Sequence, residues 1–254
     1  MKKKFRSILI LLLTLIAVGG IGYVIYYTVS LEKNEDVYEE AREVAKEEPP
    51  EEPEEPEETK PEIPIDFEAL WEMNEDVYAW IEIPGTKVDY PILQSPTDDQ
   101  YYLDHNLDGS QGYPGSIYTQ SYNGKEFEDF NTVIYGHNMK DDSMFGDLHS
   151  YEDSDFMKEN SKVIIYTPEK ILTYQIFAAV VYDDRHILLT YDFNETDDRQ
   201  EFLDSLNSLR DMRSHIDSDV EVGTDDRILT MSTCIGGEDH HRYIVEAVLI
   251  DEQK

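Results

Sequence analysis

Cysteine is almost absent from this sequence. Cys234 is the only one among 254 residues, so no intramolecular disulfide can form. Proteins that work outside the cell usually pair their cysteines or have none. A single thiol in that setting is therefore either buried and inert or chemically used, and composition alone leaves both interpretations open.

Basic residues are also scarce. The chain has 21 Lys and Arg against 56 Asp and Glu, and past residue 62 the counts are 13 and 41, a difference of −28. Such a field repels nucleic acid, so we expect no nucleic-acid partner. A well-hydrated surface explains the acidity. Calcium binding by an acidic loop stays open, although the D-x-[DN]-x-[DN]-G pattern is missing.

Metal-binding motifs are missing as well. The sequence contains neither H-E-x-x-H nor C-x-x-C, the spacings that place histidine or cysteine ligands around zinc. We therefore expect no metal site and no cofactor.

One long apolar run stands near the N-terminus. Residues 8–27 carry no charge and match the roughly 20 residues that a helix needs to span a bilayer. Residues 1–7 are basic and the chain after Ser30 is acidic, which predicts a cytoplasmic N-terminus and an extracellular remainder. A cleaved signal peptide would have a shorter apolar region and a small-residue cleavage site. Aromatic side chains stand at that place instead, which favours a single-pass membrane anchor: Tyr23, Tyr26 and Tyr27.

An acidic stalk is predicted over residues 28–62. Its first part has good helix formers, with apolar residues at roughly helical spacing: Leu31, Val37, Ala41 and Val44. Residues 47–58 contain eight Glu and four Pro, a composition typical of an extended spacer. We expect this stalk to hold a folded extracellular domain, residues 63–254, away from the membrane.

The sequence of the folded domain predicts a mainly β structure. Asp66 is a candidate cap for a short helix in which Phe67, Leu70 and Trp71 share one face. Eight runs rich in β-branched and aromatic residues then predict an eight-stranded closed barrel, the first two forming a hairpin. In order they are VYAWIEI, KVDYPIL, GSIYTQ, NTVIYG, KVIIYTP, ILTYQIFAAVVYD, RILTMSTC and RYIVEAVLID.

Two insertions interrupt the strands. The first, DDSMFGDLHSYEDSDFMKEN, predicts two short helical turns. The second is about 40 residues long and precedes the cysteine strand. An amphipathic helix is expected in it from the spacing of Phe202, Leu203, Leu206 and Leu209. Long insertions between strands often build binding walls.

The candidate nucleophile stands at the end of an apolar strand. Cys234 follows RILTMST and precedes Gly236-Gly237, a placement that leaves a side chain accessible. A thiolate needs a nearby base or positive charge. Arg242 opens the next strand after a loop of seven residues, so a hairpin would set it beside the thiol. The alternative is a surface arginine paired with Glu238 or Asp239.

The chain has seven candidate acid–base histidines. His137 ends the strand NTVIYG, so it is the only one placed like the cysteine. His240 and His241 belong to the cysteine's own hairpin, from which they are poorly placed to face the thiol. The remaining four carry no positional signal: His105, His149, His186 and His215.

These residues match a known family. The segments YGHNMKDDSMFGDL (135–148) and LTMSTC (229–234), with Arg242 opening the final strand, resemble the sortases of Gram-positive bacteria, class B best. The family pattern T-L-x-T-C is met over residues 230–234, with Met231 in place of leucine.

The resemblance implies a sortase barrel with N-terminal helices and a helix-bearing insertion before the cysteine strand. It implies that Cys234 is the nucleophile, His137 the general acid and base, and Arg242 the stabiliser of the oxyanion or substrate. It also implies a substrate groove shaped by Ser232, Tyr135, Leu103 and the walls of the 183–222 insertion.

The activity implied is that of a membrane-anchored transpeptidase. Such an enzyme cleaves a C-terminal sorting motif of a secreted protein after Thr, an NPQTN-like or LPxTG-like sequence. It then joins the acyl group to a peptidoglycan amine. A cysteine protease remains an alternative, because water can resolve the same acyl-enzyme, and so does a non-enzymatic surface-binding domain. The S-x-G-C-x-R signature of L,D-transpeptidases is absent.

Overall fold

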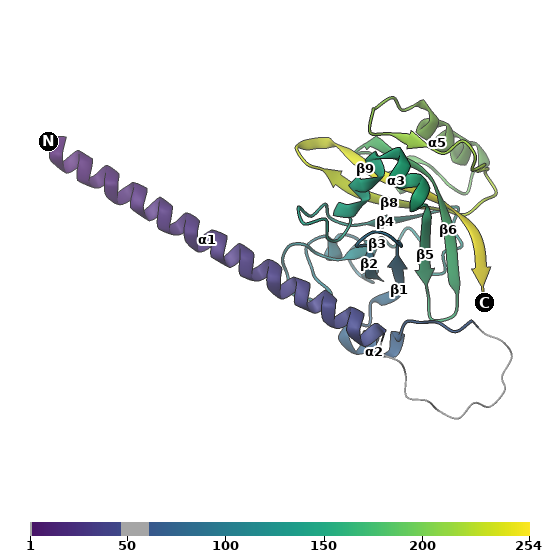
Figure 1. Ribbon diagram of the computed structural model, residues 1–254, viewed down its shortest axis with the longest axis horizontal. Coiled ribbons are helices and arrows are strands. Elements are labelled where there is room, and N and C mark those ends of the chain that lie inside the picture. The colour runs from purple at the N-terminus through teal and green to yellow at the C-terminus, as the bar shows by residue number, and fades with distance from the viewer. Residues whose placement is uncertain (1, 47–60) are drawn as a thin grey trace.

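The computed structural model describes residues 2–46 and 61–254 (Figure 1). Of residues 2–9, 31 and 32 it describes only the backbone. The spacer predicted over residues 47–58 lies outside the described residues.

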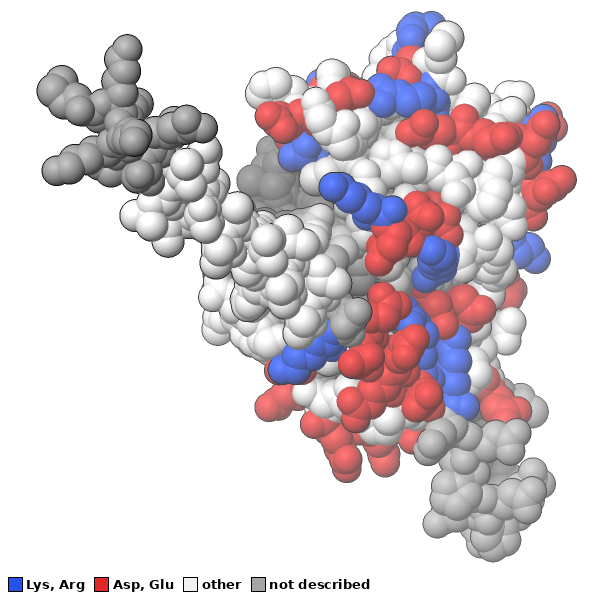
Figure 2. Space-filling model, turned by 60° about the vertical axis from the view of Figure 1, so that its left-hand side comes forward, with Lys and Arg blue, Asp and Glu red and all other residues white. Residues whose placement is uncertain are grey.

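Helix α1, Lys2–Ala45, joins the predicted anchor and the predicted juxtamembrane helix into one element. Within the described residues it is the one helix long and apolar enough to cross a membrane. Its large apolar side chains from Ile10 to Val29 are exposed, and Figure 2 shows this part as an uncharged rod beside a charged barrel.

The C-terminal part of α1 packs against the barrel. Its buried face is formed by Asn34, Tyr38, Ala41 and Ala45. The predicted face differed, because Val37 and Val44 are only half-buried and the side chain of Leu31 lies outside the description. Three of these four residues pack into the hydrophobic core, and hydrogen bonds from Asn34 and Tyr38 add to that packing.

Hydrogen bonds hold this end of α1 against the barrel. The Asn34 amide donates to the Tyr113 carbonyl at 2.7 Å, and the Tyr38 hydroxyl donates to the Gly115 carbonyl at 2.6 Å. The Asp66 N–H donates to the Ala45 carbonyl at 2.9 Å, so the chain resumes beside the point where α1 ends.

Helix α2, Phe67–Met73, begins as predicted, with the Asp66 side chain accepting a hydrogen bond from the Ala69 N–H at 3.0 Å. Phe67 and Leu70 are buried, but Trp71 is 42% exposed, so the three do not share one buried face. The indole lies at the edge because its N–H donates to the Val77 carbonyl at 2.8 Å.

Eight strands close into the predicted barrel. They are β1 Val77–Glu82, β2 Asp89–Leu93, β3 Ile117–Thr119, β4 Asn131–Tyr135, β5 Lys162–Tyr166, β6 Ile171–Asp183, β8 Ile228–Ile235 and β9 Glu238–Gln253. The order around the barrel is β5-β1-β2-β3-β4-β8-β9-β6, and β5–β6 pairing closes it. A two-residue strand, β7 His215–Ile216, adds to the edge of β6.

The turn after the cysteine strand is tighter than predicted. Strand β9 begins at Glu238, so the seven-residue loop was wrong, and two glycines make the turn. Gly237 has φ +81°, a conformation that glycine adopts without strain. The register shifts between Cys234 and Ile235, which absorbs the extra residues as a bulge.

The short helices lie outside the strands. They are η1 Tyr101–Leu103, η2 Gly146–Glu152, α3 Ser154–Glu159, α4 Ile187–Thr190 and α5 Thr196–Ser208. Helices η2 and α3 are the two predicted turns, and α5 is the predicted amphipathic helix, with Phe202, Leu203 and Leu206 buried.

Side chains of β8 and β9 alternate between two cores. Met231 and Tyr243 belong to the larger core, which fills the barrel, whereas Ile228 and Ile244 belong to a second core on the outer face. Helix α5 covers this outer face with Phe202 and its neighbours. Toward the Cys234 end, where α5 does not reach, the same outer face lines a cavity.

Candidate active site

Parallel pairing of β4 with β8 brings His137 and Cys234 to one edge. Tyr135 is the register partner of Ser232, and the Gly136 N–H donates to the Ser232 carbonyl at 3.2 Å. His137 and Cys234 each follow this pair by two residues. The two side chains predicted to react therefore leave neighbouring strand ends.

Cys234 is exposed, while the other seven residues of β8 are buried. Side chains two apart on a strand share a face, so Ser232 and Cys234 both point to the outer side of the barrel. An inert, buried cysteine is thereby excluded.

Arg242 is the register partner of Cys234 across β8 and β9. Its guanidinium donates to the main-chain carbonyls of His241, at 2.8 Å, and Asp239, at 3.3 Å. Glu238 pairs with Arg213 instead, at 2.9 Å. Within residues 2–46 and 61–254 no carboxylate forms an ion pair with Arg242, so the predicted alternative of a surface pair with Glu238 or Asp239 is wrong. The guanidinium stays available for an anion.

His137 is held from two sides. Its Nε2 donates to the Leu103 carbonyl at 2.7 Å, and its ring packs against Tyr113 with centroids 4.7 Å apart. Burial lowers the pKa of His137, and the hydrogen bond to Leu103 partly opposes this effect. The neutral ring is therefore favoured near pH 7, with Nδ1 left to take up a proton.

Gly136 lets the strand end pack tightly before His137. A Cβ at this position would lie 2.5 Å from the Ile117 side chain and 2.6 Å from the Phe145 ring. Only glycine avoids both contacts, which explains the Gly-His sequence at this strand end.

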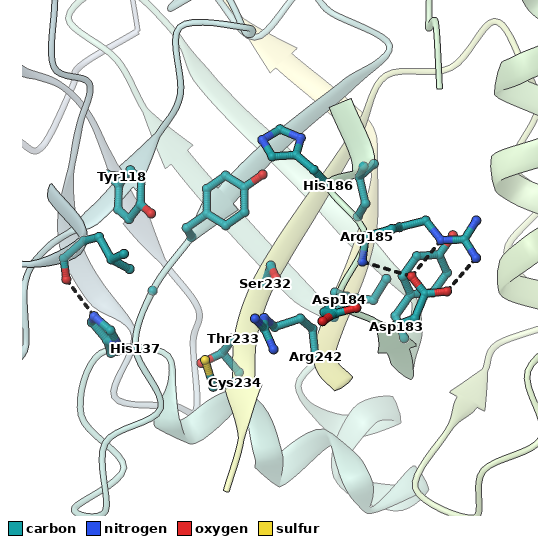
Figure 3. A pocket seen from close by; sticks show the side chains of 16 residues that line it. Tyr118, His137, Asp183, Asp184, Arg185, His186, Ser232, Thr233, Cys234 and Arg242 are labelled. Carbon is teal, nitrogen blue, oxygen red and sulfur yellow. Dashed lines mark hydrogen bonds and ion pairs between the residues drawn. The ribbon is translucent and has the colours of Figure 1, made fainter. Parts of the chain in front are cut away.

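One cavity of about 230 Å³ unites the predicted residues (Figure 3). All six line it: His137, Cys234, Arg242, Ser232, Tyr135 and Leu103. Figure 3 shows Cys234 and Arg242 close together, with His137 on the opposite wall.

The insertion contributes less to this cavity than predicted. Only its first residues, 183–187, line the wall, while α5 packs over the second core. Tyr118 also lines the cavity and was not predicted. The wall is formed by residues 183–187 because β6 pairs with β9, with Tyr182 opposite Arg242. That pairing has no signature in a single sequence.

Residues 81–250 match the family model described as Sortase domain. The chain belongs to the sortase family. It is 37% identical to sortase B of Listeria monocytogenes over 195 residues, which cover 74% of this chain and 76% of that protein. Likeness of this extent makes it a class B sortase and a cysteine transpeptidase.

Solved structures agree with the architecture of this sortase. Sortase B from B. anthracis, solved in complex with AAEK1, has a TM-score of 0.72 at 28% identity and covers 88% of this chain and 99% of its own. A Staphylococcus aureus sortase B–substrate complex has a TM-score of 0.63 at 32% identity and covers 73% and 84%.

Proposed function

We propose that α1 anchors this sortase in the cell membrane with the barrel outside the cell. We propose further that Cys234, His137 and Arg242 are its catalytic residues. It cleaves a C-terminal sorting motif, NPQTN-like or LPxTG-like, after Thr. It then transfers the acyl group to a peptidoglycan amine, which attaches a secreted protein to the cell wall.

A single observation carries the proposal. An exposed thiol, a half-buried imidazole and a guanidinium with no carboxylate partner among the described residues line one cavity, although Cys234 and His137 are 97 positions apart in the sequence. Each supplies a different requirement of acyl transfer: a nucleophile, a proton carrier and a fixed positive charge.

The chemistry follows in two steps. His137 takes the proton of the Cys234 thiol as the sulfur attacks the Thr carbonyl, and it delivers that proton to the amine that leaves when the C–N bond breaks. The incoming amine attacks the thioester and gives a proton to His137, which returns it to the sulfur as the C–S bond breaks, so that the thiol is restored. Arg242 lies beside the sulfur and stabilises the oxyanion of both tetrahedral intermediates.

Arg242 is suited to this task by its own contacts. Two main-chain carbonyls hold one edge of the guanidinium, which leaves its other donors for the substrate. A lysine would keep the charge but not the planar fork of donors.

The test uses the full chain in detergent with a set of sorting-motif peptides and a free amine. We expect Cys234→Ala and His137→Ala to lower transfer by at least about a thousandfold, and Arg242→Lys by roughly a hundredfold, since each removes one transition-state interaction. Mass spectrometry distinguishes the amide product from the hydrolysed acid.

Arg210 provides the matched control. It is exposed and donates only to nearby main-chain carbonyls, so Arg210→Lys should leave transfer unchanged. If Cys234→Ala transferred peptides as well as the unmodified enzyme, the proposed function would be wrong.

A further inference from the structure

A second histidine lies behind the nucleophile. His149, in η2, does not line the cavity, but its Nε2 lies 3.0 Å from the Cys234 main-chain carbonyl. Its Nδ1 lies 2.8 Å from the Glu152 carboxylate. The side-chain amide of Asn138 donates to the same Cys234 carbonyl at 2.9 Å.

Two of the three polar partners of His149 are acceptors, and the third is the Asn138 side-chain amide. A carbonyl and a carboxylate have no hydrogen to give, so the imidazole completes both bonds only when both of its nitrogens carry one. In that state the ring is a cation. When Nε2 lacks its hydrogen, it accepts from the Asn138 amide, 3.0 Å away, and Asn138 holds the carbonyl alone.

The Cys234 carbonyl needs such partners because of the bulge. The β8–β9 register shifts between Cys234 and Ile235, so the regular ladder is interrupted where the nucleophile stands. The side chains of Asn138 and His149 provide the hydrogen-bond donors that the interrupted ladder lacks at this carbonyl. His149 is itself fixed by stacking on Tyr243, with ring centroids 5.0 Å apart and an interplanar angle of 22°.

The surroundings of His149 contain few other charges. Glu152 is on its own helix, Cys234 on β8 and Tyr243 on β9. The Tyr243 hydroxyl donates to the Arg213 carbonyl, and the Arg213 guanidinium is paired with Asp211 and Glu238. Glu152 is thus the carboxylate in contact with the ring.

We propose that His149, oriented by Glu152, is a positioning residue for Cys234. It fixes the main chain at Cys234. As a cation, it also stabilises the thiolate form of the Cys234 side chain. The inference rests on the proposed function, in which Cys234 is the nucleophile.

The experiment measures alkylation of Cys234 by iodoacetamide between pH 5 and pH 10 in the full chain in detergent. Cys234 is the only cysteine, so mass spectrometry reports this thiol alone. His149→Gln retains a hydrogen-bond donor but removes the charge. We expect alkylation about three- to tenfold slower at pH 7, with rates that converge toward the alkaline end of the range, where an imidazole carries no charge.

Two comparisons separate charge from packing. Glu152→Gln should slow alkylation at pH 7 in the same direction, because the ring loses the carboxylate that accepts from Nδ1 and orients it. His215→Gln is the matched control, since His215 reaches only the Glu152 main-chain carbonyl, at 2.8 Å, and its profile should equal that of the unmodified chain.

The readout is independent of turnover. If His149→Gln and Glu152→Gln both gave the unmodified pH profile, the positioning role would be overturned, whatever the peptide assay showed. If His149→Gln failed to fold, Glu152→Gln alone would decide. Failure of the proposed function would appear differently, as peptide transfer by Cys234→Ala.

Discussion

At the scale of single residues, one face of β9 contains two groups with opposite surroundings. Arg242 reaches the open cavity, whereas Glu246, four residues along on the same face, is fully buried beneath α5. Burial raises the pKa of Glu246 to about 8. The neutral acid can donate to the Thr230 hydroxyl, which in turn donates to the Asn131 side-chain oxygen at 3.0 Å.

Glu246→Gln should therefore stabilise the protein, increasingly so as the pH rises. The raised pKa means that the native state holds a proton that the unfolded chain releases above pH 4.5, so stability is full below that pH and falls up to about pH 8. Glutamine avoids this loss. We expect a gain of about 3 kcal/mol in the free energy of unfolding at pH 7.

Denaturant unfolding of both proteins at pH 4 and pH 7 is the measurement. At pH 4 the two curves should nearly coincide, because glutamate is protonated in both states. A variant less stable than the unmodified chain at pH 7 would show that Glu246 is held as an anion.

The side chains proposed to react could be located from the sequence, whereas the residues that support them could not. Cys234 and His137 stand at strand ends beside glycines, a pattern that is local in the chain. His149 acts through a main-chain carbonyl 85 residues away, and any residue could provide that carbonyl. For that reason nothing in the sequence distinguished His149 from the other six histidines.

At the scale of elements, α1 is connected to His137, the proposed acid and base. Asn34 and Tyr38 donate to the carbonyls of Tyr113 and Gly115, and the Tyr113 ring packs against His137. The helix thus supports the segment that orients the imidazole.

A chain of residues 63–254 should consequently be a poorer enzyme than one of residues 31–254. Removing α1 takes away these two hydrogen bonds, each worth about 0.5–1.5 kcal/mol, and uncovers the core surface that Tyr38 and Ala41 bury. We expect a lower melting temperature and a lower kcat for the shorter chain.

Tyr38→Phe in the longer chain removes only the Tyr38 hydroxyl. It should therefore cause part of the same decrease in melting temperature and in kcat. Thermal unfolding and peptide transfer, measured on all three proteins, check this prediction. Equal kcat values for the two lengths would show that His137 is positioned without α1.

Strands were easier to predict than contacts between elements. Each of the eight runs has its own composition, and each became a strand. The docking of α1 was missed because its face is made by Asn34 and Tyr38, polar residues whose partners lie 79 and 77 residues away. The short hairpin turn was missed because the charged and polar residues 238–241 resemble a loop, although they are part of β9.

At the scale of the whole molecule, the anchor sets the side of the membrane on which the thiol lies. The basic residues 2–6 precede the apolar stretch and the acidic barrel follows it, which predicts an extracellular Cys234. The barrel surface in Figure 2 carries mixed charges with acidic groups prominent, so attraction to anionic lipid does not compete with the anchor.

A membrane-impermeant methanethiosulfonate should therefore modify the protein in intact cells. The solitary cysteine makes the result unambiguous, because Cys234→Ala removes all labelling. Labelling that required cell lysis would reverse the predicted orientation.

The hydrogen bond between Asp66 and Ala45 has a consequence for the reach of the enzyme. Since the chain returns to the end of α1 at Asp66, lengthening the glutamate–proline tract would not alter the height of the thiol above the bilayer. One residue added to α1 between Tyr27 and Asn34 would instead lift the barrel by about 1.5 Å and swing it about 100° around the helix axis. The direction in which the Cys234 end of the barrel faces is thus set by the length of helix α1. The length of the glutamate–proline tract does not affect it.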